Sequence, residues 1–185
     1  MWNSKDLALV IVIAVVSFVY SVLIGQLGAV FTGIQGLNYL FYVGHALFIS
    51  LGLLLYKGRR WRFFLQTVLV ALLSLPVSQF GAPYDVMARI PVILNGIFLD
   101  LLFNSLYQSF QNREKLLLWS LLISLVGVFT CLVFISLNFI LFISMEALNS
   151  YMNLFFMLSP ITIIEGLAGG YLAFQISERL KKMNK

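Results

Sequence analysis

The stretch GQLGAVFTGIQGLNYLFYVGH, residues 25–45, decides how the rest of the chain is organised. It is rich in glycine, contains no Asp, Glu, Lys or Arg, and lies between long hydrophobic runs. Glycine has no Cβ, so its backbone can approach another backbone or a ligand closely. Irregular backbone at membrane depth persists only where protein or a water-filled cavity satisfies its polar groups. We therefore expect a re-entrant lid over a binding pocket, with Gly28, Gly33 and Gly36 in the lid; an ordinary extracellular hairpin is the alternative.

The composition indicates a membrane protein. Of the 185 residues, 61% are hydrophobic and 10% are charged, whereas a soluble domain usually has about 25% charged residues. Nothing outside the apolar runs is long enough to fold separately, so residues 1–185 are expected to form one membrane domain. The single cysteine, Cys131, excludes an internal disulfide and a thiolate metal cluster.

Six apolar runs predict six transmembrane helices, and hence an all-α integral membrane protein. The expected helices cover residues 7–24, 39–56, 63–77, 88–110, 116–145 and 159–176. Polar turns or loops are expected at residues 57–62, 78–87, 112–115 and 146–153. The fifth run would measure about 45 Å as a helix, at about 1.5 Å per residue. It therefore has to tilt, bend near Gly127 or project beyond the membrane.

The positive charges indicate the topology. With six spans, every Lys and Arg except Arg89 falls on one side of the membrane. By the positive-inside rule, this places both termini in the cytoplasm. The net charge of +5 then reflects orientation against an anionic inner leaflet and not nucleic-acid binding. The glycine-rich stretch and the loops 78–87 and 146–153 gather on the outer face, where we expect an outward-opening pocket.

Three charged residues lie within the predicted spans: Arg89, Asp100 and Glu165. Such a charge costs about 2.5–3.5 kcal/mol at a helix centre on insertion scales and usually faces a cavity or a partner. Glu165 is expected about one turn inside the outer end of the last helix, at the depth of the pocket. The alternatives are that Arg89 snorkels to the outer interface and that the two carboxylates only bond neighbouring helices.

Aromatic and amide side chains accompany these charges on the outer side. Asn38, Tyr42 and His45 fall on one helical stripe, and aromatic rings with a few polar groups commonly line small-ligand sites. An interfacial aromatic belt and a core histidine are the alternatives. The full predicted binding set is Gln35, Asn38, Tyr39, Tyr42, His45, Tyr84, Arg89, Asn149, Tyr151 and Glu165.

Motifs of common enzymes are absent. A single histidine excludes an HExxH zinc helix, and neither GxSxG nor a P-loop occurs. No metal or cofactor is therefore expected. Two competing functions remain: a small integral-membrane enzyme that uses Asp100 or Glu165 as general acid or base, and a purely structural membrane subunit.

Small residues form two stripes that allow close helix approach. In the first helix the stripe is Ala14, Ser17, Ser21 and Gly25, suited either to docking on a partner or to internal packing. In the last helix it consists of the pairs Gly166/Gly170 and Gly169/Ala173, which predict packing.

The chain resembles the S components of energy-coupling factor (ECF) vitamin transporters, nearest the group that handles thiamine or its hydroxymethylpyrimidine precursor. The likeness lies in Gly28-x4-Gly33-x2-Gly36, followed by Tyr39, Tyr42 and Gly44 and an apolar span that ends at Tyr56 and basic residues. A second, weaker likeness is EGLAGG, residues 165–170, in the last helix.

The resemblance implies a non-enzymatic transport subunit in a prokaryotic plasma membrane. Such a subunit binds its vitamin at the outer side under the lid, then docks through its first helix onto a transmembrane coupling subunit driven by two ATPases. The alanine pair usual in that helix is absent, and Ser17-x3-Ser21-x3-Gly25 is the closest substitute. An acidic residue expected between the two tyrosines is also missing. The rings and Glu165 suit a cationic heteroaromatic ligand, whereas Arg89 would suit an anion.

Overall fold

The computed structural model describes residues 3–32, 41–78, 84–142 and 145–183. These residues form six α-helices and no strand: α1 (Ser4–Thr32), α2 (Tyr42–Tyr56), α3 (Arg62–Ser74), α4 (Ile90–Asn112), α5 (Leu116–Phe142) and α6 (Met145–Met183). A 3-10 turn, η3 (Met87–Arg89), leads into α4. The prediction of an all-helical chain is confirmed for this part of the protein.

Four segments within these helices are long and apolar enough to cross a membrane: Ser4–Gly28, Met87–Asn112, Leu116–Asn138 and Leu148–Met183. These segments indicate a membrane protein. The two other helices, α2 and α3, have 15 and 13 residues. At about 1.5 Å per residue they measure roughly 22 and 20 Å, less than the hydrocarbon core of about 30 Å. Six complete membrane crossings stay a prediction.

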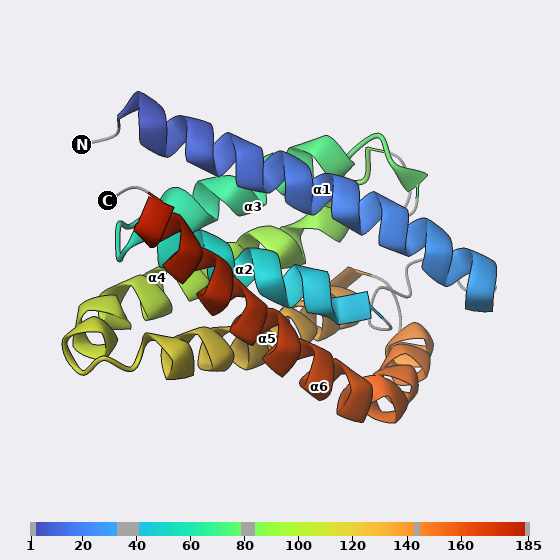
Figure 1. Ribbon diagram of the computed structural model, residues 1–185. Helices are drawn as coiled ribbons and strands as arrows, with labels where there is room; N and C mark the ends of the chain where they lie inside the picture. Colours follow the sequence, from blue (N-terminus) through green and yellow to red (C-terminus); the bar gives the residue numbers. More distant parts are fainter. Residues whose placement is uncertain (1–2, 33–40, 79–83, 143–144, 184–185) are drawn as a thin grey trace.

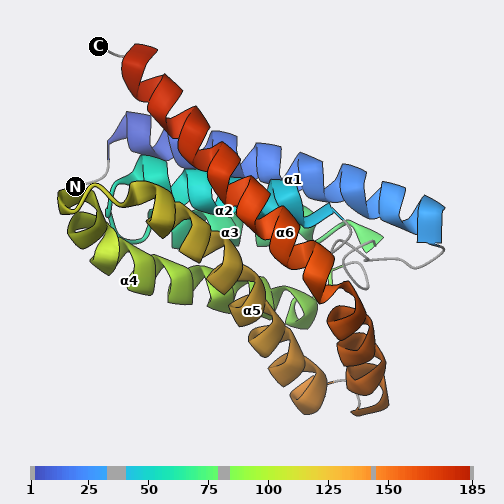
Figure 2. The ribbon, with the colours of Figure 1, turned by 60° about the horizontal axis from the view of Figure 1, so that its bottom comes forward.

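Both chain ends lie at the same end of the helical bundle (Figures 1 and 2). The α2–α3 turn and the α4–α5 turn are at that end too. These turns carry Lys57, Arg59, Arg60, Arg113 and Lys115. The basic segments thus gather at one end, as the charge pattern predicts, whereas their orientation in a membrane stays a prediction.

The polar loop predicted at residues 146–153 is wrong, because α6 is helical from Met145 onward. Asn149 and Asn153 are exposed on this helix, where polar side chains do not interrupt it. The bend in α6 (Figure 2) has a local cause in Pro160, which lies inside the helix and has no N–H to donate. The hydroxyl of Ser159 instead donates to the carbonyl of Phe156, at 2.9 Å.

Other helix ends also differ from the prediction. Helix α1 continues to Thr32, so Gly25 and Gly28 are buried helical residues and not part of a lid. Packing has overridden the weak helix propensity of glycine here. Helix α2 begins at Tyr42 and not at residue 39, and α3 ends at Ser74, shortly before Pro76. The predicted lid residues Gly33 and Gly36 lie outside the described residues.

The small residues of α6 serve packing, as predicted. A Cβ at Gly169 would lie 2.7 Å from the Cβ of Ala46 on α2, and a Cβ at Gly170 would lie 2.9 Å from the carbonyl oxygen of Ser120 on α5. The Ser120 hydroxyl donates to the Gly170 carbonyl, at 2.7 Å. Helix α2 accordingly packs most extensively on α6.

The small-residue stripe of α1 faces inward. Its four members, Ala14, Ser17, Ser21 and Gly25, are all buried. Helix α1 packs on α3 and α2, and its opposite face exposes Val12, Val16, Val19 and Leu23. In this structure the stripe therefore serves internal packing, the alternative reading of the sequence, because small side chains let α1 approach its neighbours closely; a docking role stays a prediction.

Candidate functional site

The start of α2 lies inside the bundle and is held by side chains from α1 and α6. The first N–H groups of a helix have no intrahelical partner. At α2 the Tyr42 N–H donates to Oε2 of Glu165, at 2.6 Å. The Gly44 N–H donates to the Tyr20 hydroxyl, at 3.2 Å, and that hydroxyl donates to the Phe41 carbonyl, at 2.7 Å. A glutamate and a tyrosine thus cap this helix, and the carboxylate also complements the positive end of its dipole.

Three aromatic rings meet at the same place. His45 packs edge-on against Tyr20, with ring centroids 5.4 Å apart, and is stacked near Tyr42, with centroids 6.2 Å apart. The Tyr42 hydroxyl donates to the carbonyl of Ser124 on α5, at 3.2 Å. We call Tyr20, Tyr42, His45 and Glu165 the α2-start cluster.

Two polar atoms of the α2-start cluster have unused binding capacity. The Nε2 atom of His45 is buried and has no hydrogen-bond partner among the described residues. Glu165 is half-buried, and the hydrogen bond to its Oε2 is the only one that the described part of the chain makes to its carboxylate. A buried polar atom without a partner is costly. The cluster therefore offers one acceptor oxygen, one imidazole nitrogen and aromatic faces to a small ligand.

Gly44 permits the close contact at this site. A Cβ at Gly44 would overlap the ring of Tyr20, so only glycine allows the Tyr20 hydroxyl to reach the backbone of α2. The sequence interpretation did not include Tyr20. A signal was available, since Tyr20 follows Ser17 by three residues in a helix that is otherwise almost entirely aliphatic there.

Asp100 has a structural role at the other end of the bundle. It is fully buried, at 0% exposure. Its Oδ1 accepts the Trp61 N–H and the Asn104 side-chain amide, each at 2.8 Å, and its Oδ2 accepts the Phe64 N–H at 2.9 Å. Asp100 thus caps the start of α3 just as Glu165 caps the start of α2. The two carboxylates serve different helices and do not form a pair.

Arg89 is also engaged in the fold. It is buried, at 3% exposure, and its Nη2 donates to the carbonyls of Ser74 and Val77, at 3.0 and 3.3 Å, at the end of α3. It neither snorkels to an interface nor belongs to the α2-start cluster.

Two other predicted binding residues, Tyr84 and Asn149, are not brought to the cluster. Tyr84 is 72% exposed, and its φ of 62° places its backbone in the left-handed region. Asn149 is exposed on the first part of α6. Of the other predicted residues, Gln35, Asn38, Tyr39 and the side chain of Tyr151 lie outside the described residues. Tyr42, His45 and Glu165 are thus the predicted residues that the structure brings together.

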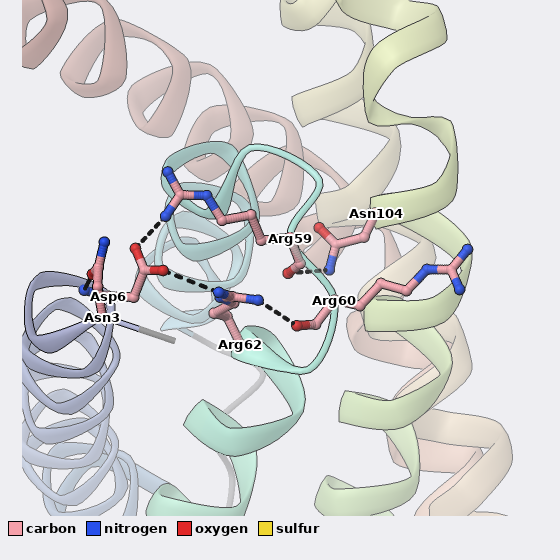
Figure 3. Close-up of polar contacts among 6 residues, drawn as sticks. All are labelled: Asn3, Asp6, Arg59, Arg60, Arg62 and Asn104. Atoms are coloured by element: carbon pink, nitrogen blue, oxygen red, sulfur yellow. Dashed lines mark hydrogen bonds and ion pairs between the residues drawn. The ribbon is translucent and has the colours of Figure 1, made fainter. Parts of the chain in front are cut away.

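A second polar cluster lies at the basic end of the bundle (Figure 3). Asp6 of α1 forms ion pairs with Arg59 and with Arg62, the latter at 3.0 Å. Arg62 also donates to the Arg60 carbonyl, at 3.0 Å, and the Arg60 side chain points away from this cluster (Figure 3). These contacts connect the start of α1 to the α2–α3 turn, so the negative charge of Asp6 stabilises the fold.

No group of three or more His, Cys, Asp and Glu side chains suitable for a metal ion occurs in the described part of the chain. Comparison of the chain with models of known protein families, with curated proteins and with solved structures finds no match.

Proposed function

We propose that this chain is the substrate-binding membrane subunit of an importer of the ECF type, which captures a vitamin or vitamin precursor at the outer face of a prokaryotic plasma membrane. The observation that carries the proposal is the α2-start cluster, in which one carboxylate oxygen of Glu165 accepts no hydrogen bond from the described residues and three aromatic rings meet nearby. The cluster is built around the start of α2, away from the end where the basic segments gather.

The chemistry of the cluster suits a planar, nitrogen-containing ring that carries a positive charge or N–H donors. Glu165 accepts a hydrogen bond or pairs with the charge, and the faces of Tyr20 and Tyr42 attract a cation by about 0.5–2 kcal/mol per contact. A thiamine-like ligand has this chemistry. The anionic alternative loses its support, since Arg89 is occupied with the carbonyls at the end of α3.

Uptake by such a subunit requires a transmembrane coupling subunit and two ATPase subunits. The α1 stripe is buried, so docking on the coupling subunit requires either another surface or a movement of α1. The transport proposal does not depend on which of these applies, since the ligand site is formed at the start of α2.

The competing functions make different use of the carboxylates. An enzyme built on an Asp100–Glu165 pair is disfavoured by geometry, because each carboxylate caps a different short helix. A structural membrane subunit would bind no small molecule at the α2-start cluster.

Two measurements test the proposal. Native mass spectrometry of the purified full chain should detect a co-purifying small molecule. Calorimetry with that molecule, or with thiamine as a probe, should show affinity more than tenfold weaker in Glu165→Gln, a change of about 1.4 kcal/mol. Glutamine keeps an acceptor oxygen for the Tyr42 N–H, but it removes the charge and replaces the second carboxylate oxygen by an NH2 donor.

The matched control is Glu146→Gln, a change of the same type at an exposed position on the same helix. It should leave affinity unchanged. If Glu165→Gln binds as well as the unchanged protein, Glu165 is not the anchor of the ligand. Absence of any bound small molecule would favour the structural subunit.

A further inference from the structure

A depression of about 310 Å³ lies on the surface of α6, apart from the α2-start cluster. It is lined by Tyr171, Leu172, Gln175, Ile176 and Arg179. Their spacing places them on one side of the helix. Tyr171 and Leu172 are 48% and 44% exposed, whereas the glycines next to them in sequence face α2 and α5. The depression therefore opens outward from the bundle and is not part of its core.

The two ends of this depression differ in chemistry. Leu172 and Ile176 provide apolar surface within the segment that is long enough to span a membrane. Arg179 is exposed and belongs to the last turns of α6, the end of that helix that lies beside the basic turns. Within the described residues its guanidinium makes no ion pair. The neighbouring carboxylate, that of Glu178, pairs with Lys181 instead, at 2.6 Å.

A ligand that fills the depression has to satisfy both ends. Its apolar part would lie along Leu172 and Ile176, and its anionic part would pair with Arg179, since a guanidinium presents N–H groups in a geometry that fits phosphate oxygens. Gln175, between the two ends, offers a side-chain amide to a polar headgroup or linker. A free inorganic anion would leave the apolar wall uncovered.

We infer that this depression binds an anionic phospholipid, with the phosphate at Arg179 and an acyl chain along Leu172 and Ile176. The depression would then hold one lipid in a fixed place at the basic end of the bundle, where anionic headgroups are attracted. The inference requires only that the chain lies in a membrane, and it is independent of the proposed transport function.

Native mass spectrometry of the full chain, titrated with phosphatidylglycerol or with phosphatidylcholine of the same acyl chains, tests the inference. Phosphatidylglycerol should bind more tightly to the unchanged protein. Arg179→Gln should weaken phosphatidylglycerol binding by about fivefold, the effect expected for one basic residue near a membrane surface. The same variant should leave phosphatidylcholine binding nearly unchanged.

Two further variants separate a defined site from general attraction. Arg113→Gln removes an exposed positive charge from the α4–α5 turn at the same end of the bundle and should have no effect on lipid binding. Leu172→Ser should weaken the binding of both lipids, because it removes apolar surface from the acyl-chain half.

Three results would overturn the inference. Equal losses in Arg179→Gln and Arg113→Gln would mean that the basic end attracts anionic lipid only diffusely. If Arg179→Gln still preferred phosphatidylglycerol over phosphatidylcholine as the unchanged protein does, Arg179 would not bind the phosphate and the proposed lipid site would be wrong. Full displacement of the bound phosphatidylglycerol by inorganic phosphate would show that the acyl chain contributes nothing. The thermal unfolding midpoint of each variant is first measured without added lipid. Only variants with the midpoint of the unchanged protein are compared, so that misfolding is not mistaken for lost binding.

Discussion

Arg89, directly before α4, and Asp100, about three turns further along α4, bind opposite ends of the same helix, α3. Asp100 accepts backbone N–H groups at the start of α3, including that of Phe64, and Arg89 donates to carbonyls at its end, including that of Ser74. The signs agree with the helix dipole, which favours a negative group at the N-terminus and a positive group at the C-terminus. The α3 helix thus obtains partners for backbone groups at both of its ends from the segment of α4 and the turn before it.

The Asp100→Asn variant should be less stable by about 1–3 kcal/mol, because the amide removes the charge and one acceptor at a fully buried position. The thermal unfolding midpoint in detergent measures this loss. Glu114→Gln, at an exposed position in the α4–α5 turn, is the matched control and should unfold like the unchanged protein. Ligand affinity of the folded Asp100→Asn protein should not change, and a selective loss of affinity would return Asp100 to the binding site.

The Arg89→Gln variant should also lower stability, by about 1–3 kcal/mol, because it leaves carbonyls of Ser74 and Val77 without their donor. Thermal unfolding again gives the measurement, with Arg113→Gln as the control at an exposed arginine. Calorimetry on the folded variant should show unchanged ligand affinity. A large drop in affinity at normal stability would support the anionic ligand that the structure disfavours.

The orientation of the bundle predicts the accessibility of single cysteines. In a Cys131→Ala background, Tyr84→Cys should react with a membrane-impermeant reagent added to intact cells, since Tyr84 is strongly exposed and belongs to the predicted outer loop between α3 and α4. Arg59→Cys should react only after the membrane is opened, because positive loops stay in the cytoplasm. Labelling of residue 59 from outside would contradict the proposed topology.

The inward position of the α1 stripe predicts a stability effect for larger side chains. Ser17→Leu and Ser21→Leu should destabilise the isolated protein by about 1–3 kcal/mol, because added volume at a packed position causes strain. Val16→Leu, on the exposed side of the same helix, should be neutral. Unfolding measurements on the chain alone distinguish this from docking: normal stability combined with lost transport would make the stripe a partner surface.

Gly169 and Gly127 provide a matched pair of glycine-to-alanine tests. A Cβ at Gly169 would lie 2.9 Å from the backbone nitrogen of Leu47, whereas the nearest atom to a Cβ at Gly127 is 3.5 Å away, on Ile49. Gly169→Ala should therefore push α6 away from α2, lower the unfolding midpoint and weaken ligand binding, because both helices hold the α2-start cluster. Gly127→Ala should be tolerated. Equal midpoints would mean that the α2–α6 contact is looser than the structure indicates.

The sequence alone determined the all-helical class. Long apolar runs with few charges are typical of membrane spans, and a helix satisfies the backbone hydrogen bonds of such a run within the run itself. It also indicated that the basic turns share one end, since the charges lie between the apolar runs in alternate connections. Tyr42, His45 and Glu165 could be chosen because aromatic, imidazole and carboxyl groups are rare and costly at that depth. The packing role of the glycines in α6 followed from their spacing.

Only the tertiary structure decided what each charged or small residue does. Asp100 and Glu165 have the same chemistry in the sequence, yet three donors engage the first at the start of α3 and one backbone donor engages the second at the start of α2. Helix α6 runs through residues 146–153, where Met152 contacts Ser136 of α5. Ser17 and Ser21 face inward, where α1 packs on α2 and α3. The physical reason is that local sequence sets a residue's capacity to bond, whereas contacts between distant segments determine which partner uses that capacity.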